Sequence, residues 1–131
     1  MDNSKIKILV VDDDELLQEI LVLVLEDVGY VVDKASDGKE AWELMQGKRY
    51  DLLLTDLYMP EMNGIELILK SQQQFPDTKI VLLSGGGREL KADSEANSVI
   101  YDGQQIDVDI YLKKPSDTEQ MLAAIKRLLS T

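Results

Sequence analysis

The sequence predicts an α/β fold with a parallel sheet. Short apolar runs, β-branched or rich in leucine, alternate along the chain with segments whose apolar residues recur at helical spacing. Apolar runs of this kind are typical of strands that helices cover on both faces. The chain is 131 residues long, about the size of one domain, and no repeat or linker divides it. We therefore expect one domain in which five strands alternate with five helices.

Four of the strands are indicated by compact apolar runs. The expected ranges are 6–11 (IKILVV), 31–35 (VVDKA), 50–56 (YDLLLTD) and 79–84 (KIVLLS). The first run is rich in β-branched residues and is bounded by charged residues, which favours a strand buried on both faces.

Helical patterns follow these strands and carry start and stop signals. The first pattern has apolar residues from Leu17 to Val28 and stops at Gly29. The other starts are expected at an Asp37–Glu40 capping box, near Asn63-Gly64 and at a Ser116–Glu119 capping box, with stops at Gly47 and before Pro76. These signals support the alternating order of strands and helices.

The segment from Arg88 to Gln105 has the least distinct pattern. Its apolar residues permit a thin amphipathic helix that Asp102-Gly103 would end; they are Ala92, Ala96, Val99 and Ile100. The residues from Ile106 to Leu112 then alternate, with Asp107, Asp109 and Tyr111 on the other face. Such alternation predicts an edge strand with one face in water.

Composition excludes several classes of function. The chain has no cysteine and no histidine, which excludes a disulfide framework, a zinc ribbon, a thiol nucleophile and a Ser-His triad. The net charge of −11 argues against direct binding of nucleic acid, whose phosphates attract a basic face. The first residues, MDNSKIKILVVDDD, become acidic too soon for a signal peptide, and nowhere do 18 apolar residues run together, so we expect a cytoplasmic chain without a membrane span.

Polar and charged residues gather where the expected strands end. The residues at these ends are Asp12–Asp14, Asp56, Ser84–Gly87 and Lys114-Pro115. In an open α/β sheet the carboxyl ends of the strands form the usual ligand site. Taken singly, the first aspartates could cap a helix and the lysine could be solvated. Together, several carboxylates repel one another, and a divalent cation such as Mg²⁺ relieves that repulsion.

Four blocks of the sequence resemble the response-regulator receiver domain of bacterial two-component signalling. The blocks are ILVVDDDELL, DLLLTDLYMPEMNGIEL, VLLSGGG and IYLKKP, and they occur in order at the expected strand ends. The resemblance covers essentially the whole chain, as a single receiver domain at residues 1–131. It implies a flavodoxin-like (βα)5 fold, doubly wound, with strand order 2-1-3-4-5.

The resemblance also implies roles for individual residues. Asp56 would be the phosphoacceptor, and Mg²⁺ would be held by Asp13, by Asp56 and by the backbone carbonyl of Tyr58, with Asp12 acting through a water. Lys114 would supply a positive charge on the opposite side. Ser84 would follow the new phosphoryl oxygen with its hydroxyl, and Tyr111 would be the aromatic switch that turns inward. On the residues alone, Tyr111 could equally be an ordinary aromatic of an edge strand.

The implied activity is that of a signalling switch, not of an enzyme. The phosphoryl group would come from a histidine kinase or a histidine phosphotransfer protein and would switch the face formed by helix 4, strand 5 and helix 5. A downstream protein or effector domain would receive the signal, and a homodimer on activation is possible. The sequence departs from the family around residues 88–105, which are longer than expected, so partner and dimer mode stay open.

Two alternatives stay open beside this interpretation. The first is a receiver-like interaction module that never carries phosphate, although such modules tend to lack one or more of Asp13, Asp56, Ser84 and Lys114. The second is a phosphatase of the haloacid-dehalogenase type, which also uses a nucleophilic aspartate with Mg²⁺. Against it, Asp56 is followed by Leu57-Tyr58 rather than by an acid two residues on, and 131 residues leave no room for a cap domain.

Overall fold

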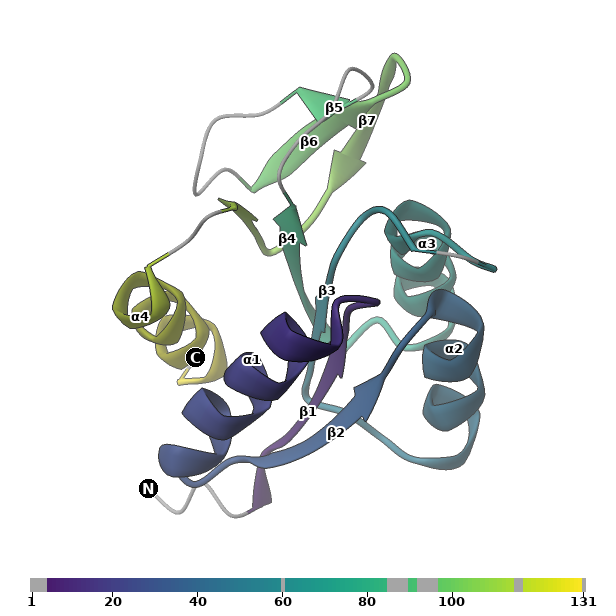
Figure 1. The fold of residues 1–131 in the computed structure, drawn as a ribbon. Coiled ribbons are helices and arrows are strands. Elements are labelled where there is room, and N and C mark those ends of the chain that lie inside the picture. Colours follow the sequence, from purple (N-terminus) through teal and green to yellow (C-terminus); the bar gives the residue numbers. More distant parts are fainter. Residues whose placement is uncertain (1–4, 60, 85–89, 92–96, 115–116, 131) are drawn as a thin grey trace.

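A five-stranded parallel sheet forms the centre of the molecule (Figure 1). The computed structural model describes residues 5–59, 61–84, 90–91, 97–114 and 117–130. The strands of this sheet lie in the order β2-β1-β3-β4-β8. Their bounds are β1 Lys7–Val11, β2 Val31–Ala35, β3 Leu52–Thr55, β4 Lys79–Ser84 and β8 Ile110–Lys113. The predicted α/β class and strand order 2-1-3-4-5 are confirmed, with β8 as the fifth strand of the sheet.

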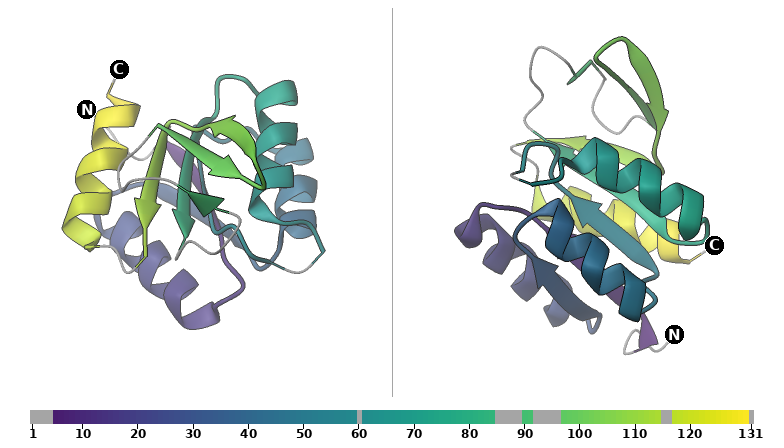
Figure 2. Two further views of the ribbon diagram at one scale, coloured as in Figure 1. Left: turned by 90° about the horizontal axis from the view of Figure 1, so that it is seen from above. Right: turned by 90° about the vertical axis from the view of Figure 1, so that its right-hand side faces the viewer.

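Helices cover both faces of the sheet (Figure 2). Their bounds are α1 Glu15–Asp27, α2 Gly38–Gly47, α3 Gly64–Gln74 and α4 Thr118–Leu129. One apolar core lies under α1 and α4, where Leu21 and Ile125 pack against strand residues such as Val10. The other lies under α2 and α3, where Ala41 and Ile68 are fully buried. Among the described residues, no helix has the length and apolar character that crossing a bilayer requires.

Aspartate or asparagine side chains cap the described helices at their N-termini. Asp14, Asp37, Asn63 and Asp117 each accept a hydrogen bond from a backbone N–H in the first turn. The Asp37 and Asn63 starts were predicted. The Ser116 cap was wrong, because Asp117 lies one residue closer to the helix and its carboxylate accepts from the N–H of Glu119 at 2.8 Å. Ser116 itself lies outside the described residues.

The region expected to form a thin helix contains a β-hairpin instead. Strands β6 (Ser98–Tyr101) and β7 (Gln104–Asp107) pair antiparallel, and β5 (Leu90–Lys91) pairs with β6. Asp102 and Gly103 join β6 to β7, and their φ angles are positive, at 49° and 79°. Two positive φ angles in a two-residue loop are the mark of a type I′ turn, for which Asp-Gly is a preferred pair. Of the expected helix, Val99 and Ile100 lie in β6, and Ala92 and Ala96 lie outside the described residues.

The antiparallel sheet of β5, β6 and β7 stands at the carboxyl end of β4 (Figure 1). Its inward-facing side chains Val99 and Ile106 are 1% and 2% exposed and belong to the core under α2 and α3. Gln72 of α3 donates a 2.7 Å hydrogen bond to the carbonyl of Asp107 at the end of β7. This small sheet therefore packs against the core under α2 and α3, in the stretch of chain where a helix was expected.

The predicted strand from Ile106 to Leu112 is divided into β7 and β8. The division falls at Asp109, whose carboxylate accepts a 2.6 Å hydrogen bond from the N–H of Ile80 and so anchors the start of β8 to β4. The prediction that the face with Tyr111 lies in water is also wrong for this residue, which is only 2% exposed. Tyr111 is buried because it packs in one core with Val99 and Ile106 of the antiparallel sheet.

Candidate functional site

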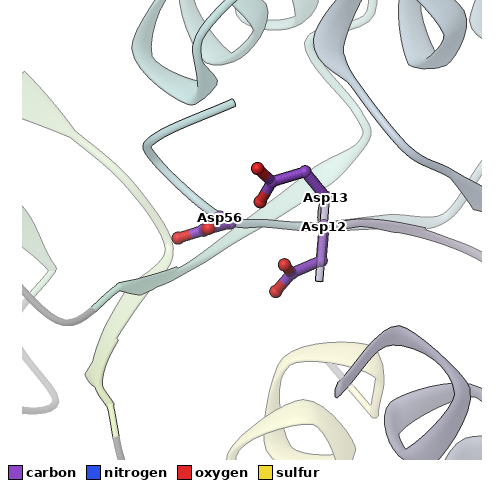
Figure 3. A group of neighbouring side chains, drawn as sticks. All are labelled: Asp12, Asp13 and Asp56. Atoms are coloured by element: carbon purple, nitrogen blue, oxygen red, sulfur yellow. The ribbon is translucent and has the colours of Figure 1, made fainter. Parts of the chain in front are cut away.

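Three aspartates meet at the carboxyl edge of the main sheet. Asp12 and Asp13 follow β1, and Asp56 follows β3, its neighbour in the sheet. One carboxylate oxygen from each residue lies within 4.8 Å of the others, and the three side chains extend toward the same side of the view (Figure 3). Asp12 is buried, the Asp56 side chain is 12% exposed, and Asp13 is exposed. The site is therefore an acidic pocket that opens to solvent on the Asp13 side.

Lys114 closes the pocket from the end of β8. Its Nζ lies 3.0 Å from Oδ2 of Asp12 and 3.4 Å from Oδ1 of Asp56. The backbone N–H of Lys114 donates to the carbonyl of Ser84 at 2.8 Å, which fixes the base of the side chain. One ammonium therefore lies against two of the three carboxylates of the pocket.

The pKa of Asp56 is raised above its ordinary value of 3.8. Burial is the main cause, and the negative charge of Asp12 adds to it. The ammonium of Lys114 and the backbone N–H of Leu57, which donates to Oδ1 at 2.8 Å, act in the opposite direction. The positive charge around Asp56 therefore does not fully offset the cost of burying its ionised carboxylate. Carboxylates grouped in this way fit Mg²⁺, which binds oxygen ligands and keeps several waters.

A tight loop positions Asp56 at the end of β3. The hydroxyl of Thr55 donates to the carbonyl of Asp56 at 2.8 Å, and the N–H of Gly64 donates to the carbonyl of Leu57 at 2.7 Å. A Cβ at Gly64 would lie 2.1 Å from the carbonyl oxygen of Asp56. Position 64 therefore requires glycine so that α3 can begin directly against the backbone of the acidic residue.

The remaining predicted residues lie around this pocket. Ser84 ends β4, is fully buried and lies beside β8, whereas Tyr58 lies in the loop after β3 with 43% of its surface exposed. Tyr111 points inward, and its hydroxyl donates a 3.1 Å hydrogen bond to the backbone carbonyl of Ser84. Pro115, which follows Lys114, lies outside the described residues. The roles of Ser84, Tyr58 and Tyr111 stay predictions.

Sequence reasoning missed Gln18. This glutamine of α1 is 4% exposed, and its Nε2 donates to the carbonyl of Asp12 at 3.1 Å and to that of Ala35 at 2.7 Å. A signal was available, because Gln18 precedes the buried Leu21 and Leu25 by three and seven residues and so shares their inward face. A polar residue on an apolar stripe needs a buried partner.

Comparison with known proteins identifies the family. Residues 8–126 match the response regulator receiver domain. The transcriptional regulatory protein CrdR of Helicobacter pylori is 34% identical over 125 residues, which are 95% of this chain and 55% of that protein. The response regulator receiver protein CpdR of Brucella abortus is 41% identical over 91 residues, 69% of this chain and 76% of that protein. The chain thus spans about half the length of CrdR.

Solved structures agree with this match. The response regulator TrrA of Thermotoga maritima, solved in complex with Mg²⁺ and BeF, has 28% sequence identity and a TM-score of 0.77, covering 94% of this chain and 98% of that one. A CheY-like receiver domain from Methanospirillum hungatei gives 28% identity and a TM-score of 0.78, covering 95% and 94%. The acidic pocket of Asp12, Asp13 and Asp56 lies where the sequence resemblance implied a receiver site. The chain belongs to the response regulator receiver domain family of two-component signalling, whose members act as signalling switches rather than as catalytic enzymes.

Proposed function

We propose that this chain is a phosphoacceptor receiver in which Asp56 carries the phosphoryl group. The observation that supports the proposal most strongly is the position of Asp56 at the end of β3. There its carboxylate lies within 4.8 Å of those of Asp12 and Asp13 and 3.4 Å from the ammonium of Lys114. A nucleophilic carboxylate, acidic ligands for a cation and a fixed positive charge are the groups that phosphoryl transfer to an aspartate requires.

The reacting oxygen is Oδ2 of Asp56 in this proposal. Oδ1 is engaged by the N–H of Leu57 and by the ammonium of Lys114, which leaves Oδ2 to attack. A bond forms between Oδ2 and phosphorus, and the bond from phosphorus to the donor nitrogen of a phosphohistidine breaks. The electron pair of the broken bond stays on the donor. The product on this chain is an acyl phosphate.

Asp13 and Asp56 would hold Mg²⁺, together with the backbone carbonyl of Tyr58 and, through a water, Asp12. When bound, the cation neutralises charge on the phosphoryl oxygens. The fit rests on the donor set, because three carboxylates this close repel one another and need a positive partner. Burial is the main cause of the raised pKa of Asp56, and the charge of Asp12 adds to it. Lys114 would stabilise the phosphoryl group from the side that faces β8.

Ser84 and Tyr111 would pass the signal to the surface. The Ser84 hydroxyl would follow the new phosphoryl oxygen, and any movement of the Ser84 peptide would reach Tyr111 through the hydrogen bond between them. The face expected to switch was that of helix 4, strand 5 and helix 5. Here the antiparallel sheet β5-β6-β7 stands in the place of that helix, so we propose that this sheet, β8 and α4 form the switching face.

Receiver domains interact with histidine kinases, and we propose a histidine kinase or a histidine phosphotransfer protein as the phosphoryl donor. A downstream protein or effector domain would be the receiver of the signal. We propose that residues 1–131 form a single receiver domain.

An intact-mass measurement tests this function. The chain is incubated with acetyl phosphate and Mg²⁺, and in parallel with acetyl phosphate and a chelator. A gain of one phosphoryl group that depends on Mg²⁺ is the expected result. A chain that gains no mass in either sample would instead be a receiver-like interaction module.

A further inference from the structure

Gln18 contacts the backbone of the acidic pocket without contributing a carboxylate to it. The first turns of α1 place its side chain inward, where it is 4% exposed. Its single amide nitrogen carries two hydrogens, and both are used: one in the 3.1 Å bond to the carbonyl of Asp12 and one in the 2.7 Å bond to the carbonyl of Ala35. The amide therefore bridges the carboxyl ends of β1 and β2.

The two carbonyls are also joined to each other through Asp12. The backbone N–H of Asp12 donates to the carbonyl of Ala35 at 3.2 Å. The Ala35 carbonyl therefore accepts one hydrogen bond from the end of β1 and one from the Gln18 side chain of α1. The carbonyl of Asp12 belongs to the peptide bond that leads to Asp13. By holding that carbonyl, Gln18 fixes the plane of the Asp12–Asp13 peptide and the direction in which Asp13 leaves the strand.

The two aspartates differ in how their side chains are held. The carboxylate of Asp12 has the ammonium of Lys114 at 3.0 Å and the N–H of Asp14 at 2.9 Å. Asp13 is exposed, yet its carboxylate lies within 4.8 Å of those of Asp12 and Asp56. Repulsion among the three favours rotation of Asp13 away into solvent. The Asp12–Asp13 peptide, held by Gln18, sets the backbone position from which the Asp13 side chain reaches the pocket.

We propose that Gln18 is a positioning residue for the divalent-cation site, acting through the Asp12–Asp13 peptide. The inference rests on the proposed function, because it assigns to Gln18 the geometry of a metal site that the phosphoacceptor role requires. Groups that orient metal ligands change metal affinity by about 10- to 100-fold when they are removed. The alternative is a purely structural tie between α1 and the sheet, which would affect stability and leave cation affinity unchanged.

The test compares the Mg²⁺ affinity of the wild type with that of Gln18→Met, which has similar length and no donor. The backbone amide signals of Asp12, Asp13 and Asp14 report binding during a Mg²⁺ titration, with no phosphorylation involved. Gln18→Met is expected to weaken Mg²⁺ binding by about tenfold. The matched control is Leu25→Val, a mildly destabilising change on the same buried face of α1, two turns beyond Gln18. It should bind Mg²⁺ like the wild type.

A second measurement uses the unaltered chain and covers the case in which Gln18→Met does not fold. The side-chain amide signals of Gln18 should shift during the same titration, with the dissociation constant seen at the Asp13 amide. Unchanged affinity in Gln18→Met, or Gln18 signals that stay still while the Asp13 amide shifts, would overturn the positioning role and leave the proposed function intact. A wild type whose Asp13 amide does not respond to Mg²⁺ would overturn both.

Discussion

The hydroxyl of Tyr111 donates a hydrogen bond to the backbone carbonyl of Ser84 across a distance of 3.1 Å. The same carbonyl accepts the backbone N–H of Lys114 at 2.8 Å. One peptide at the end of β4 thus connects the residue proposed to sense the phosphoryl group with the lysine of the pocket and the buried tyrosine of β8. A movement of the Ser84 peptide would therefore change the hydrogen bond that holds the Tyr111 hydroxyl.

Removing the Tyr111 hydroxyl is expected to destabilise the fold. Tyr111→Phe keeps the ring in the core and deletes the donor to Ser84, at an expected cost of about 0.5–1.5 kcal/mol in the free energy of unfolding. Urea denaturation measures the cost. Tyr101→Phe is the control, because Tyr101 packs only partly buried against the same core. Equal costs for the two variants would contradict the importance of the bond to Ser84.

Neutralising Asp56 should stabilise the fold at neutral pH. The pKa of Asp56 is raised, chiefly by burial and further by the charge of Asp12, so the folded state binds this proton more tightly than the unfolded chain does. Stability therefore increases as the pH falls from above the folded pKa of Asp56 toward 3.8, its ordinary value. Asp56→Asn lacks the charge, so it should melt above the wild type at pH 7.

The difference in melting temperature between Asp56→Asn and the wild type should become smaller as the pH is lowered. Thermal unfolding across the acid range measures it, with the exposed Asp77→Asn as the control. A lower melting temperature for Asp56→Asn at pH 7, or a difference that does not depend on pH, would show that the buried charge of Asp56 does not destabilise the fold.

A side chain at position 64 should disturb the site. The Cβ of Gly64→Ala would lie 2.1 Å from the carbonyl oxygen of Asp56, and the backbone there must shift to admit it. We expect a loss of about 1–3 kcal/mol in the free energy of unfolding, as for other overpacking changes, and slower phosphorylation of Asp56. Gly47→Ala is the matched control, since nothing lies within 4 Å of its added Cβ. If both alanines were tolerated equally, the close approach of α3 to Asp56 would be wrong.

The hairpin of β6 and β7 should contribute to the core through one face only. Ile106 of β7 is 2% exposed and packs under the α2–α3 layer, whereas Ile100 of β6 is 45% exposed. We expect Ile106→Ala to cost about 2–5 kcal/mol in the free energy of unfolding and Ile100→Ala to cost far less. Chemical denaturation of the two variants distinguishes this arrangement from a helix, in which Val99 and Ile100 would share the buried stripe.

The sequence was most informative where local signals and the sheet pattern agreed. The apolar runs that became β1, β3 and β4 are buried on both faces, and the acids after them meet because parallel strands end at one edge of the sheet. Asp12, Asp13 and Asp56 were therefore predictable as a group from the order of the strands and from the resemblance to a known family.

Prediction failed where one signal had two meanings. Asp102-Gly103 can end a helix or form a hairpin turn, and sparse apolar residues such as Val99 and Ile100 fit either pattern. Only the packing of Val99 and Ile106 against the core decides between them. The burial of Tyr111 follows from that same packing, so an alternation pattern within 106–112 could not show it.

The most direct test of Asp56 as the phosphoacceptor locates the phosphoryl group. After incubation with acetyl phosphate and Mg²⁺, borohydride reduces an acyl phosphate to an alcohol and leaves free carboxylates unchanged, so that tandem mass spectrometry of the peptides identifies the reduced residue. We expect reduction at Asp56 alone in the wild type and at no residue in Asp56→Asn. Reduction at Asp12 or Asp13, or equal labelling of the wild type and Asp56→Asn, would contradict this expectation.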